Sequence, residues 1–308
     1  MLLRRVLTDD AIVLQACDDD GAWVAAPERA AALGGPVFDR GWELALAQRH
    51  QREAGQLLPF QPVSFRDFML YERHAVDAAR GLVRRFHPRQ ARVAGAIEAL
   101  TRRPFPLFKP KPLFYRQPIY YMSNHLSFVP SGAPVAVPSY SSALDFELEL
   151  GFVLSAPLYD ATPEQALAAI GAFVVVNDFS ARDVQRAEMV SGLGPQKSKH
   201  FASSMSVLAV TAEEILPQIE RLYGSVAING ATVATVSSAG MQWSLGEVLA
   251  HASRSERLYP GELFATGTLP GGSGMETGRW LRPGDQLSLT IDQIGEISHR
   301  ITSAQEPT

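Results

Sequence analysis

The sequence predicts an α+β protein that is mostly β-strand from about residue 119 onward, and three observations support this. In Leu144–Leu150 apolar residues alternate with acidic ones, and a period of two is the period of a strand. Val174–Val176 is an apolar run that is typical of a buried strand. Val226–Val233 contains Asn229-Gly230, which favours the type I′ turn of a β-hairpin.

Residues 1–60 are predicted to form a small N-terminal domain. Ala11–Leu14 and Ala22–Val24 have the pattern of short strands, and Asp18–Gly21 between them is a turn signal. A helical stretch follows at Trp42–Glu53. Pro59–Pro62 then breaks the chain, because proline restricts both itself and the residue before it, and we place the domain boundary there.

Residues 61–302 are predicted to form the second and larger domain. Its first part, residues 65–100, is helix-rich, with Pro88 as an interruption. Residues 104–118 contain five prolines, and we expect an extended loop that crosses the surface or the edge of a cleft.

Inside the β-rich region, two segments have the pattern of a helix capping box, Thr162–Gln165 and Ser244–Glu247. Leu287–Ile291 and Ile297–Ile301 have the pattern of a terminal hairpin. The tail, residues 303–308, is predicted to be disordered.

The composition excludes several classes of protein. Of 308 residues, 46% are apolar and 19% are charged, which is enough for a substantial core. The formal net charge of −4 argues against nucleic-acid binding, and no apolar run is long enough to cross a bilayer. The N-terminus lacks the pattern of a signal peptide. Cys17 is the only cysteine, so no intrachain disulfide can form. We expect a cytoplasmic protein with no nucleic-acid or membrane partner.

Carboxylates gather in two separate segments. Asp145, Glu147 and Glu149 share one face of their strand by period, and Asp178 ends the apolar run that precedes it. Carboxylates that converge repel one another unless a cation neutralises them, and an all-oxygen set favours Mg²⁺, Ca²⁺ or Mn²⁺ over Zn²⁺. The same alternation also describes the solvated face of a half-buried antiparallel strand, so both interpretations remain open at this point.

Five blocks in order along the chain resemble the fumarylacetoacetate hydrolase superfamily over residues 61–302. They are Glu147-Leu148-Glu149, Asn177–Asp183, Lys199, Gly267-Thr268 and Pro283–Asp285. The resemblance implies a mixed β-roll, a homodimer and one divalent metal ion per subunit. It also implies cleavage of a C–C bond in a 1,3-diketone, or a related reaction on a 2-keto acid.

The resemblance to fumarylacetoacetase itself includes Asp67 and His74, which six residues separate. It implies that Asp67, Glu147, Glu149 and Asp178 are the metal ligands. Asp145 shares the acidic face by period but matches no ligand of the family, and it stands as an alternative.

The resemblance also implies a general base. His74 can take a proton from water near neutral pH, and Glu276 matches the carboxylate that orients this histidine.

Three further residues are candidates for stabilising negative charge in the reaction, Arg182, Gln185 and Lys199. Arg182 and Gln185 share a face if they lie on a helical turn. Lys197 is the alternative to Lys199 because the two lysines are so close in the sequence.

Tyr121 and Thr268 match substrate-binding positions of the family, with Tyr120 as the alternative tyrosine. Met69 stands where fumarylacetoacetase has a tyrosine, and only Arg80 and Arg84 flank the place of its substrate-binding arginine. These departures indicate a substrate other than fumarylacetoacetate.

The predicted function is therefore metal-dependent hydrolysis of a C–C bond in a 1,3-diketone or an acylpyruvate-type keto acid. A hydratase, isomerase or decarboxylase of 2-keto acids on the same metal site is the alternative enzyme. A metal-binding protein without catalytic activity is the alternative from another class.

Overall fold

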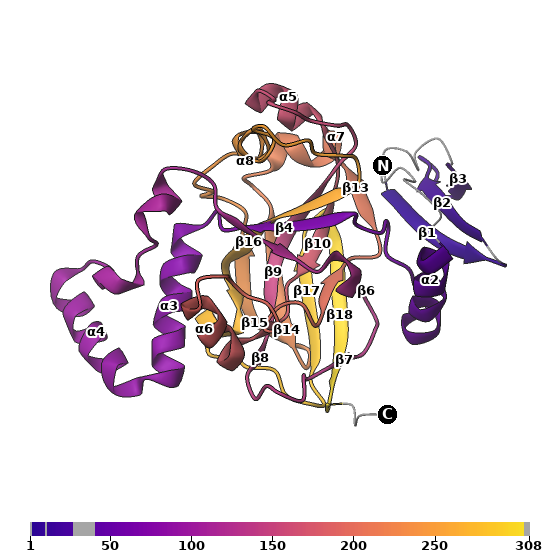
Figure 1. The fold of residues 1–308 in the computed structure, drawn as a ribbon. Helices are drawn as coiled ribbons and strands as arrows, with labels where there is room; N and C mark the ends of the chain where they lie inside the picture. Colours follow the sequence, from indigo (N-terminus) through magenta and orange to yellow (C-terminus); the bar gives the residue numbers. More distant parts are fainter. Residues whose placement is uncertain (1, 10, 27–40, 305–308) are drawn as a thin grey trace.

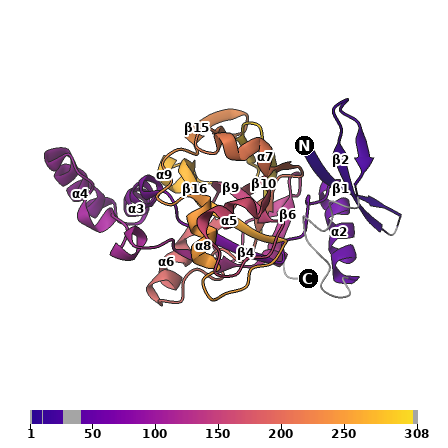
Figure 2. The same cartoon turned by 90° about the horizontal axis from the view of Figure 1, so that it is seen from above.

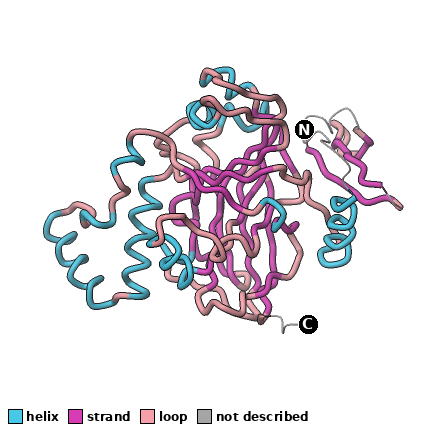
Figure 3. The backbone as a smooth tube through the Cα atoms, viewed as in Figure 1, coloured by secondary structure: helices cyan, strands magenta, loops and turns pink. Residues whose placement is uncertain are grey.

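The structure is a computed structural model that describes residues 2–9, 11–26 and 41–304. Most strands lie at the centre of the molecule, and helices and the N-terminal strands lie at its periphery (Figure 1, Figure 3). The fold is α+β and dominated by sheet, which confirms the predicted fold class. Within the described residues, no helix combines the length and the apolar character needed to cross a membrane.

Most strands belong to two sheets. The larger sheet has 11 strands in the described residues, with the order β3-β2-β1-β13-β10-β9-β16-β4-β5; in addition, β12 pairs with β10, and β6 pairs with β12. The second sheet has five strands, in the order β15-β14-β17-β18-β7, and β8 pairs with β11 alone. The strands are β1 (Leu2–Thr8), β2 (Ala11–Cys17), β3 (Trp23–Ala25), β4 (Ser64–Phe68), β5 (Tyr120–Ser123), β6 (Phe128–Pro130), β7 (Val135–Ala136), β8 (Leu144–Asp145), β9 (Glu147–Leu154), β10 (Ile170–Asn177), β11 (Ser180–Ala181), β12 (Ser203–Met205), β13 (Ala209–Thr211), β14 (Tyr223–Ile228), β15 (Ala231–Ser237), β16 (Glu262–Ser273), β17 (Gln286–Ile291) and β18 (Gly295–Thr302).

The helices surround these sheets. The α-helices are α2 (Gly41–Ala54), α3 (Glu72–Phe86), α4 (Pro88–Thr101), α5 (Pro163–Ala168), α6 (Arg182–Val190), α7 (Ala212–Ile215), α8 (Leu245–Ala252) and α9 (Gly274–Thr277). Short 3₁₀ helices are η2 (Pro106–Phe108), η3 (Pro112–Tyr115), η4 (His125–Ser127) and η5 (Leu216–Gln218). Figure 2 shows α4 at one end of the molecule, with β1, β2 and α2 at the other.

The N-terminal strands continue the large sheet instead of forming one of their own. β1 pairs with β13 through Leu2 and Leu3, and β2 pairs with β1. The strands and the helix predicted within residues 1–60 are confirmed as β2, β3 and α2. The division into domains at residue 60 stays a prediction.

The core lies on both faces of the central strands. One apolar cluster fills the space between the large sheet and the five-stranded sheet, with Phe152 and Leu289 among its members. A second cluster lies on the opposite face of the large sheet, with Val153 and Phe65 among its members. Residues 144–150 are all buried, the apolar ones in the first of these clusters. This excludes a solvated face as the explanation of their alternating pattern.

Other local predictions have mixed outcomes. Asn229 and Gly230 both have positive φ, as the type I′ turn requires, and both capping boxes are present. Residues 104–118 were expected to be extended, but they contain η2 and η3, each with a proline at its first position. The fixed φ of proline suits the first turn of a helix, so these prolines start short helices. Of the predicted tail, residues 305–308 lie outside the described residues.

Candidate active site

Three carboxylates meet on one face of neighbouring strands of the large sheet. Asp67 lies on β4, Glu149 on β9, and Asp178 directly follows β10. Glu149 pairs with Val176 of β10 and with Thr268 of β16, and β4 runs beside β16 on its other side. Because side chains at alternate positions share a face, this strand order brings together carboxylates that are far apart in the sequence.

The three carboxylates fit a hard metal ion. One oxygen from each lies within 4.8 Å of the others, and all three residues are buried. Oδ1 of Asp67 and Oε2 of Glu149 are buried and have no hydrogen-bond partner among the residues that the structure describes. Burial and the charge of Asp178 raise the pKa of Asp67 well above its ordinary value, and burial and the charge of Asp67 do the same for the pKa of Glu149. An ion with oxygen ligands would satisfy these atoms and relieve the repulsion.

Glu147 lies beside the trio but already has cationic partners. Its Oε1 accepts a hydrogen bond of 2.7 Å from Arg182, and its Oε2 contacts the ammonium of Lys199. Burial alone would raise the pKa of Glu147, but Arg182 and Lys199 outweigh it and lower that pKa below its ordinary value. The role of Glu147 as a metal ligand stays a prediction.

Asp145 has a structural environment that differs from that of the trio. It accepts hydrogen bonds from Nε of Arg182 at 2.8 Å and from the backbone N–H groups of Gly274 and Met275 at 2.7 and 3.0 Å. The structure thus joins Asp145 to the start of α9, the helix that carries Glu276.

The predicted base, His74, is buried on α3 and faces α9. Its Nδ1 lies 2.9 Å from Oε2 of Glu276, a close contact whose angles do not meet those of a hydrogen bond. Its Nε2 lies 3.7 Å from Oε1 of Glu147. Burial would lower the pKa of His74, but the Glu276 carboxylate and then Glu147 outweigh it and raise that pKa.

Glu276 is itself held by a residue that the sequence analysis did not single out. Ser273 donates hydrogen bonds to Oε2 of Glu276 from its hydroxyl at 2.9 Å and from its backbone N–H at 3.2 Å. The backbone N–H of Gly271 donates to Oε1 at 2.9 Å. The signal was present, because Ser273 and Glu276 have the spacing of a capping box, which the structure forms at α9.

The sequence left two alternatives open, Lys199 or Lys197 and Tyr121 or Tyr120, and the members of each pair have different contacts in the structure. Lys199 contacts both Glu147 and Asp178, whereas Lys197 lies over the exposed ring of Tyr140. Tyr121 donates its hydroxyl to Asp178, whereas Tyr120 packs against Phe68. Lys199 and Tyr121 thus lie at the carboxylates, and their alternatives do not contact them.

The remaining candidates lie around the same centre. Gln185 accepts a hydrogen bond of 2.9 Å from Nη1 of Arg182 on α6, and Thr268 donates to Oε1 of Glu149 at 3.4 Å. The turn that presents Thr268 needs Gly267, because its φ is +77° and a Cβ there would collide with the Phe68 carbonyl. Arg80 lies apart from the site and pairs with Glu98 and Asp77.

A cavity of about 510 Å³ opens onto this centre. Its lining includes the predicted base, most of the predicted ligands and Met69, together with loop 107–111, which confirms that the proline-rich segment borders a cleft. The residues of the predicted site that line it are Asp67, His74, Tyr121, Glu147, Glu149, Arg182, Gln185, Lys199 and Thr268.

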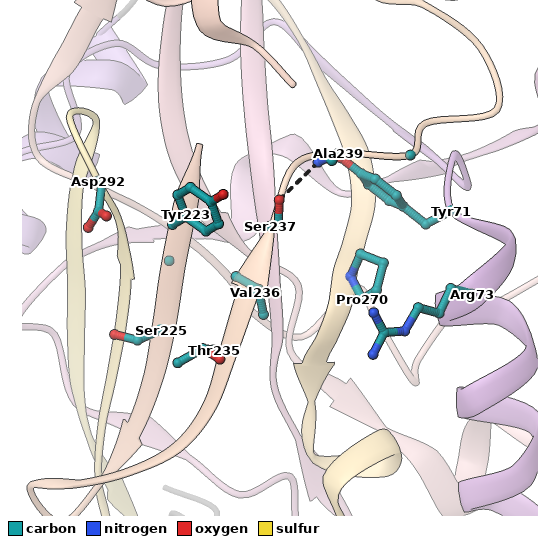
Figure 4. Close-up of a pocket in the computed structure, with 12 residues that line it drawn as sticks. Tyr71, Arg73, Tyr223, Ser225, Thr235, Val236, Ser237, Ala239, Pro270 and Asp292 are labelled. Atoms are coloured by element: carbon teal, nitrogen blue, oxygen red, sulfur yellow. Dashed lines mark hydrogen bonds between the residues drawn. The ribbon is translucent and has the colours of Figure 1, made fainter. Parts of the chain in front are cut away.

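A larger cavity of about 660 Å³ lies elsewhere and has different chemistry (Figure 4). Tyr71 and Arg73 line it beside α3, and the β14–β15 hairpin lines it from the other side, through Tyr223 and Thr235 for example. It contains none of the predicted site residues. Because it lacks both the carboxylate trio and the base, the smaller cavity is the candidate active site.

Comparison with known proteins agrees with this geometry. The family model described as fumarylacetoacetate (FAA) hydrolase C-terminal matches residues 89–302, which confirms the superfamily predicted from the sequence. Oxaloacetate tautomerase YisK of Bacillus subtilis is 32% identical over 162 residues, which are 52% of this chain and 53% of the relative. This chain therefore matches only about half the length of that relative.

Solved structures share the fold over nearly the whole chain. The 5-carboxymethyl-2-hydroxymuconate delta-isomerase of Mycobacterium smegmatis superposes with a TM-score of 0.67 and 18% identity, over 98% of this chain and 100% of the other. The fumarylacetoacetate hydrolase of Exiguobacterium antarcticum superposes with a TM-score of 0.68 and 19% identity, over 98% and 99% of the two chains. At this level of identity the likeness concerns the fold alone.

Proposed function

Because this chain belongs to the fumarylacetoacetate hydrolase C-terminal family, we propose that it is a divalent-metal-dependent enzyme that moves a proton on a 2-keto acid. The observation that carries this proposal is the buried His74–Glu276 pair beside the carboxylate trio. A base next to a metal-binding site suits proton abstraction beside a carbonyl.

Asp67, Glu149 and Asp178 would hold the ion, with Glu147 as a predicted fourth ligand. We propose Mg²⁺, or Mn²⁺ or Ca²⁺, because all these ligands are oxygens. The ion would supply Lewis acidity at the carbonyl oxygen of the keto acid. Buried oxygens of Asp67 and Glu149, which find no hydrogen-bond partner in the described part of the chain, support this assignment.

His74 would transfer the proton, and Glu276 would hold its ring. With Nδ1 turned toward Glu276, Nε2 is the nitrogen on the side of Glu147 and the cavity. Glu276 stabilises the imidazolium that forms when the ring accepts a proton, and the contacts from Ser273 keep this carboxylate in place.

Cationic and hydrogen-bonding groups would balance the negative charge that develops on the substrate. Lys199, Arg182 and Gln185 line the cavity close to the carboxylates, and Tyr121 and Thr268 complete the wall around them. Preorganised donors of this kind stabilise charge without reorganising during the reaction.

Keto–enol tautomerisation or isomerisation is the reaction that we favour. It needs only a base, for which we propose His74, and a site that stabilises an enolate, for which we propose the carboxylate trio with its ion. The match to oxaloacetate tautomerase YisK supports it. Hydrolysis of a C–C bond, the reaction first predicted from the sequence, is the second candidate, because the same His74–Glu276 pair suits the activation of water.

One panel of assays separates the two reactions. The enzyme, with Mg²⁺ or with excess chelator, is mixed with enol-oxaloacetate and with acylpyruvates. Metal-dependent acceleration of enol decay without cleavage products supports tautomerisation, whereas metal-dependent loss of the diketone with release of two acids supports hydrolysis. Acceleration of neither reaction would contradict the proposed function.

We also propose a homodimer, which rests on the family resemblance, and a cytoplasmic location, which rests on the single cysteine. Sedimentation at micromolar protein concentration tests the dimer, and a monomer there would contradict it.

A further inference from the structure

Asp145 is a buried carboxylate that the proposed function leaves without a role. It is fully buried, and it is not among the described residues that line the candidate active-site cavity. A group in this place can act on the reaction only through the residues that it holds. Its hydrogen bonds lead to two parts of the site, α9 and Arg182.

Four donors from the described residues fill the acceptor sites of Asp145. Its Oδ1 accepts from the backbone N–H groups of Phe146 at 2.8 Å and Gly274 at 2.7 Å. Its Oδ2 accepts from Nε of Arg182 at 2.8 Å and from the backbone N–H of Met275 at 3.0 Å. A carboxylate offers about four acceptor sites. This environment argues against the alternative, open at the level of the sequence, that Asp145 is a metal ligand.

Two of these hydrogen bonds hold the start of α9. The helix consists of the four residues Gly274–Thr277, and a single helical turn is not stable by itself. The first N–H groups of a helix have no acceptor within it, and Asp145 accepts from two of them. Ser273 caps the same turn. The place of Glu276, which belongs to this turn, therefore depends on both residues.

The same short helix contacts the helix that carries the proposed base. A Cβ added at Gly81 of α3 would lie 1.7 Å from the carbonyl oxygen of Met275, so the backbones of α3 and α9 are in close contact. Between the same two helices, Nδ1 of His74 lies 2.9 Å from Oε2 of Glu276. A displacement of α9 away from Asp145 would therefore move Glu276 relative to His74.

Asp145 can fix α9 because the strands hold Asp145 itself. It pairs with Ser180 in the ladder of β8 and β11, and Arg182 directly follows β11. Nη2 of Arg182 in turn donates to Oε1 of Glu147 at 2.7 Å. Through Asp145, α9 is thus tied to the segment that carries Glu147.

We propose that Asp145 is a positioning residue, which holds the Glu276 carboxylate against the ring of His74 through its hydrogen bonds to the first turn of α9. This inference rests on the proposed function, since it takes His74 to be the base. It adds a residue that contacts neither the ion nor the substrate and acts on the reaction through Glu276.

Steady-state kinetics of Asp145→Asn tests the inference. The amide oxygen should stay on the charged Arg182, because charge-assisted hydrogen bonds are the stronger ones. The amide NH₂ group then faces the backbone N–H of Gly274, for which it is no acceptor. With Mg²⁺ and the substrate that the native protein converts, kcat should fall about 10- to 100-fold, since a misplacement of about 1 Å can cost about 10²-fold. KM should stay within about twofold, because a loss confined to the transition state lowers kcat alone.

A double-mutant cycle with Glu276→Gln shows whether Asp145 acts through Glu276. In the Glu276→Gln protein, adding Asp145→Asn should change kcat by no more than about twofold, because the oriented carboxylate is already lost. Losses that multiply in the double variant would overturn the inference, as would an unchanged kcat in folded Asp145→Asn. The Mg²⁺-induced rise in Tm should persist in Asp145→Asn, and its disappearance would make Asp145 a ligand and also overturn the inference.

Glu262→Gln is the matched control. Glu262 is likewise a buried carboxylate paired with an arginine, Arg66, and it is not among the described residues that line the cavity. This variant should lower Tm and keep kcat within about twofold.

Gly274→Ala is the second variant, in case Asp145→Asn does not fold. Its Cβ would lie 2.4 Å from Oδ1 of Asp145, so the start of α9 must move away from the carboxylate while the pair with Arg182 remains. It should show the same loss of kcat and the same lack of further loss in the Glu276→Gln protein, and an unchanged kcat would overturn the inference. No turnover by the native protein in either assay contradicts the proposed function, and this inference with it.

Discussion

Replacing Asp67 by asparagine should raise the thermal stability of the ion-free protein and lower the stabilisation that a metal ion gives. Asp67, Glu149 and Asp178 lie within 4.8 Å of one another and are buried. Two ionised carboxylates at that separation repel by about 3 kcal/mol at an effective dielectric constant of about 20. The raised pKa values of Asp67 and Glu149 mean that protonation already relieves part of this repulsion. We therefore expect Asp67→Asn to stabilise the ion-free protein by about 1 kcal/mol.

The sign of the pH dependence follows from the same groups. Because their pKa values are raised, the folded protein holds protons that the unfolded chain releases. Without an ion, these two groups therefore make stability decrease as pH rises above the ordinary carboxyl pKa. A bound ion would offset the repulsion between the ionised carboxylates. At a concentration of about 100 Kd it should add about 2.7 kcal/mol to the native protein, which is a rise in Tm of about 5 °C or more.

Differential scanning calorimetry at neutral pH, in excess chelator and then in excess Mg²⁺, measures both effects. Asp67→Asn should lose most of the Mg²⁺-induced rise in Tm and should melt no lower than the native protein in chelator. Asp292→Asn removes an exposed carboxylate away from the site and is the control. A full Mg²⁺-induced rise in Asp67→Asn would refute the reasoning, as would a large loss of Tm in chelator.

Three more predictions follow from the geometry. His74→Ala should lower kcat by a factor of about 10²–10⁴ in steady-state assays and leave Mg²⁺ binding intact. Glu276→Gln should lower kcat by a smaller factor. Gly81→Ala should lower both Tm and kcat, because a Cβ there collides with the α9 backbone. Gly95→Ala is the control: its Cβ has open space, and the substitution should raise the free energy of unfolding by about 0.5–1 kcal/mol. Burial lowers the pKa of His299 to about 4, so about 3 kcal/mol of stability should be lost as pH falls from 6.5 to 4 in urea titrations. His299→Gln should flatten that dependence.

Specific outcomes would contradict each of these. Near-native turnover in His74→Ala would exclude the proposed base. Equal effects of Gly81→Ala and Gly95→Ala would mean that the contact between α3 and α9 does not position the site. If His299→Gln loses the same stability between pH 6.5 and 4 as the native protein, other groups cause that loss.

Local patterns in the sequence were enough to identify many elements and several site residues. The period of residues 144–150 and the apolar run before Asp178 depend on the geometry of a single strand, and the capping boxes depend on a single helical turn. The resemblance to a family supplied the pairing of Asp67 with His74. None of these signals requires knowledge of which strands are neighbours.

The tertiary structure alone decided the distances within the site. The alternation at Glu147 and Glu149 does not distinguish a solvated face from a buried one, and only the burial of both carboxylates in the folded protein excluded the solvated face. Strand order placed Asp67 near Glu149 and Asp178. Tertiary packing also paired Lys199 with both Glu147 and Asp178. Strand order and side-chain pairing arise from many contacts between residues remote in the sequence, whereas a local pattern reports only the path of its own segment.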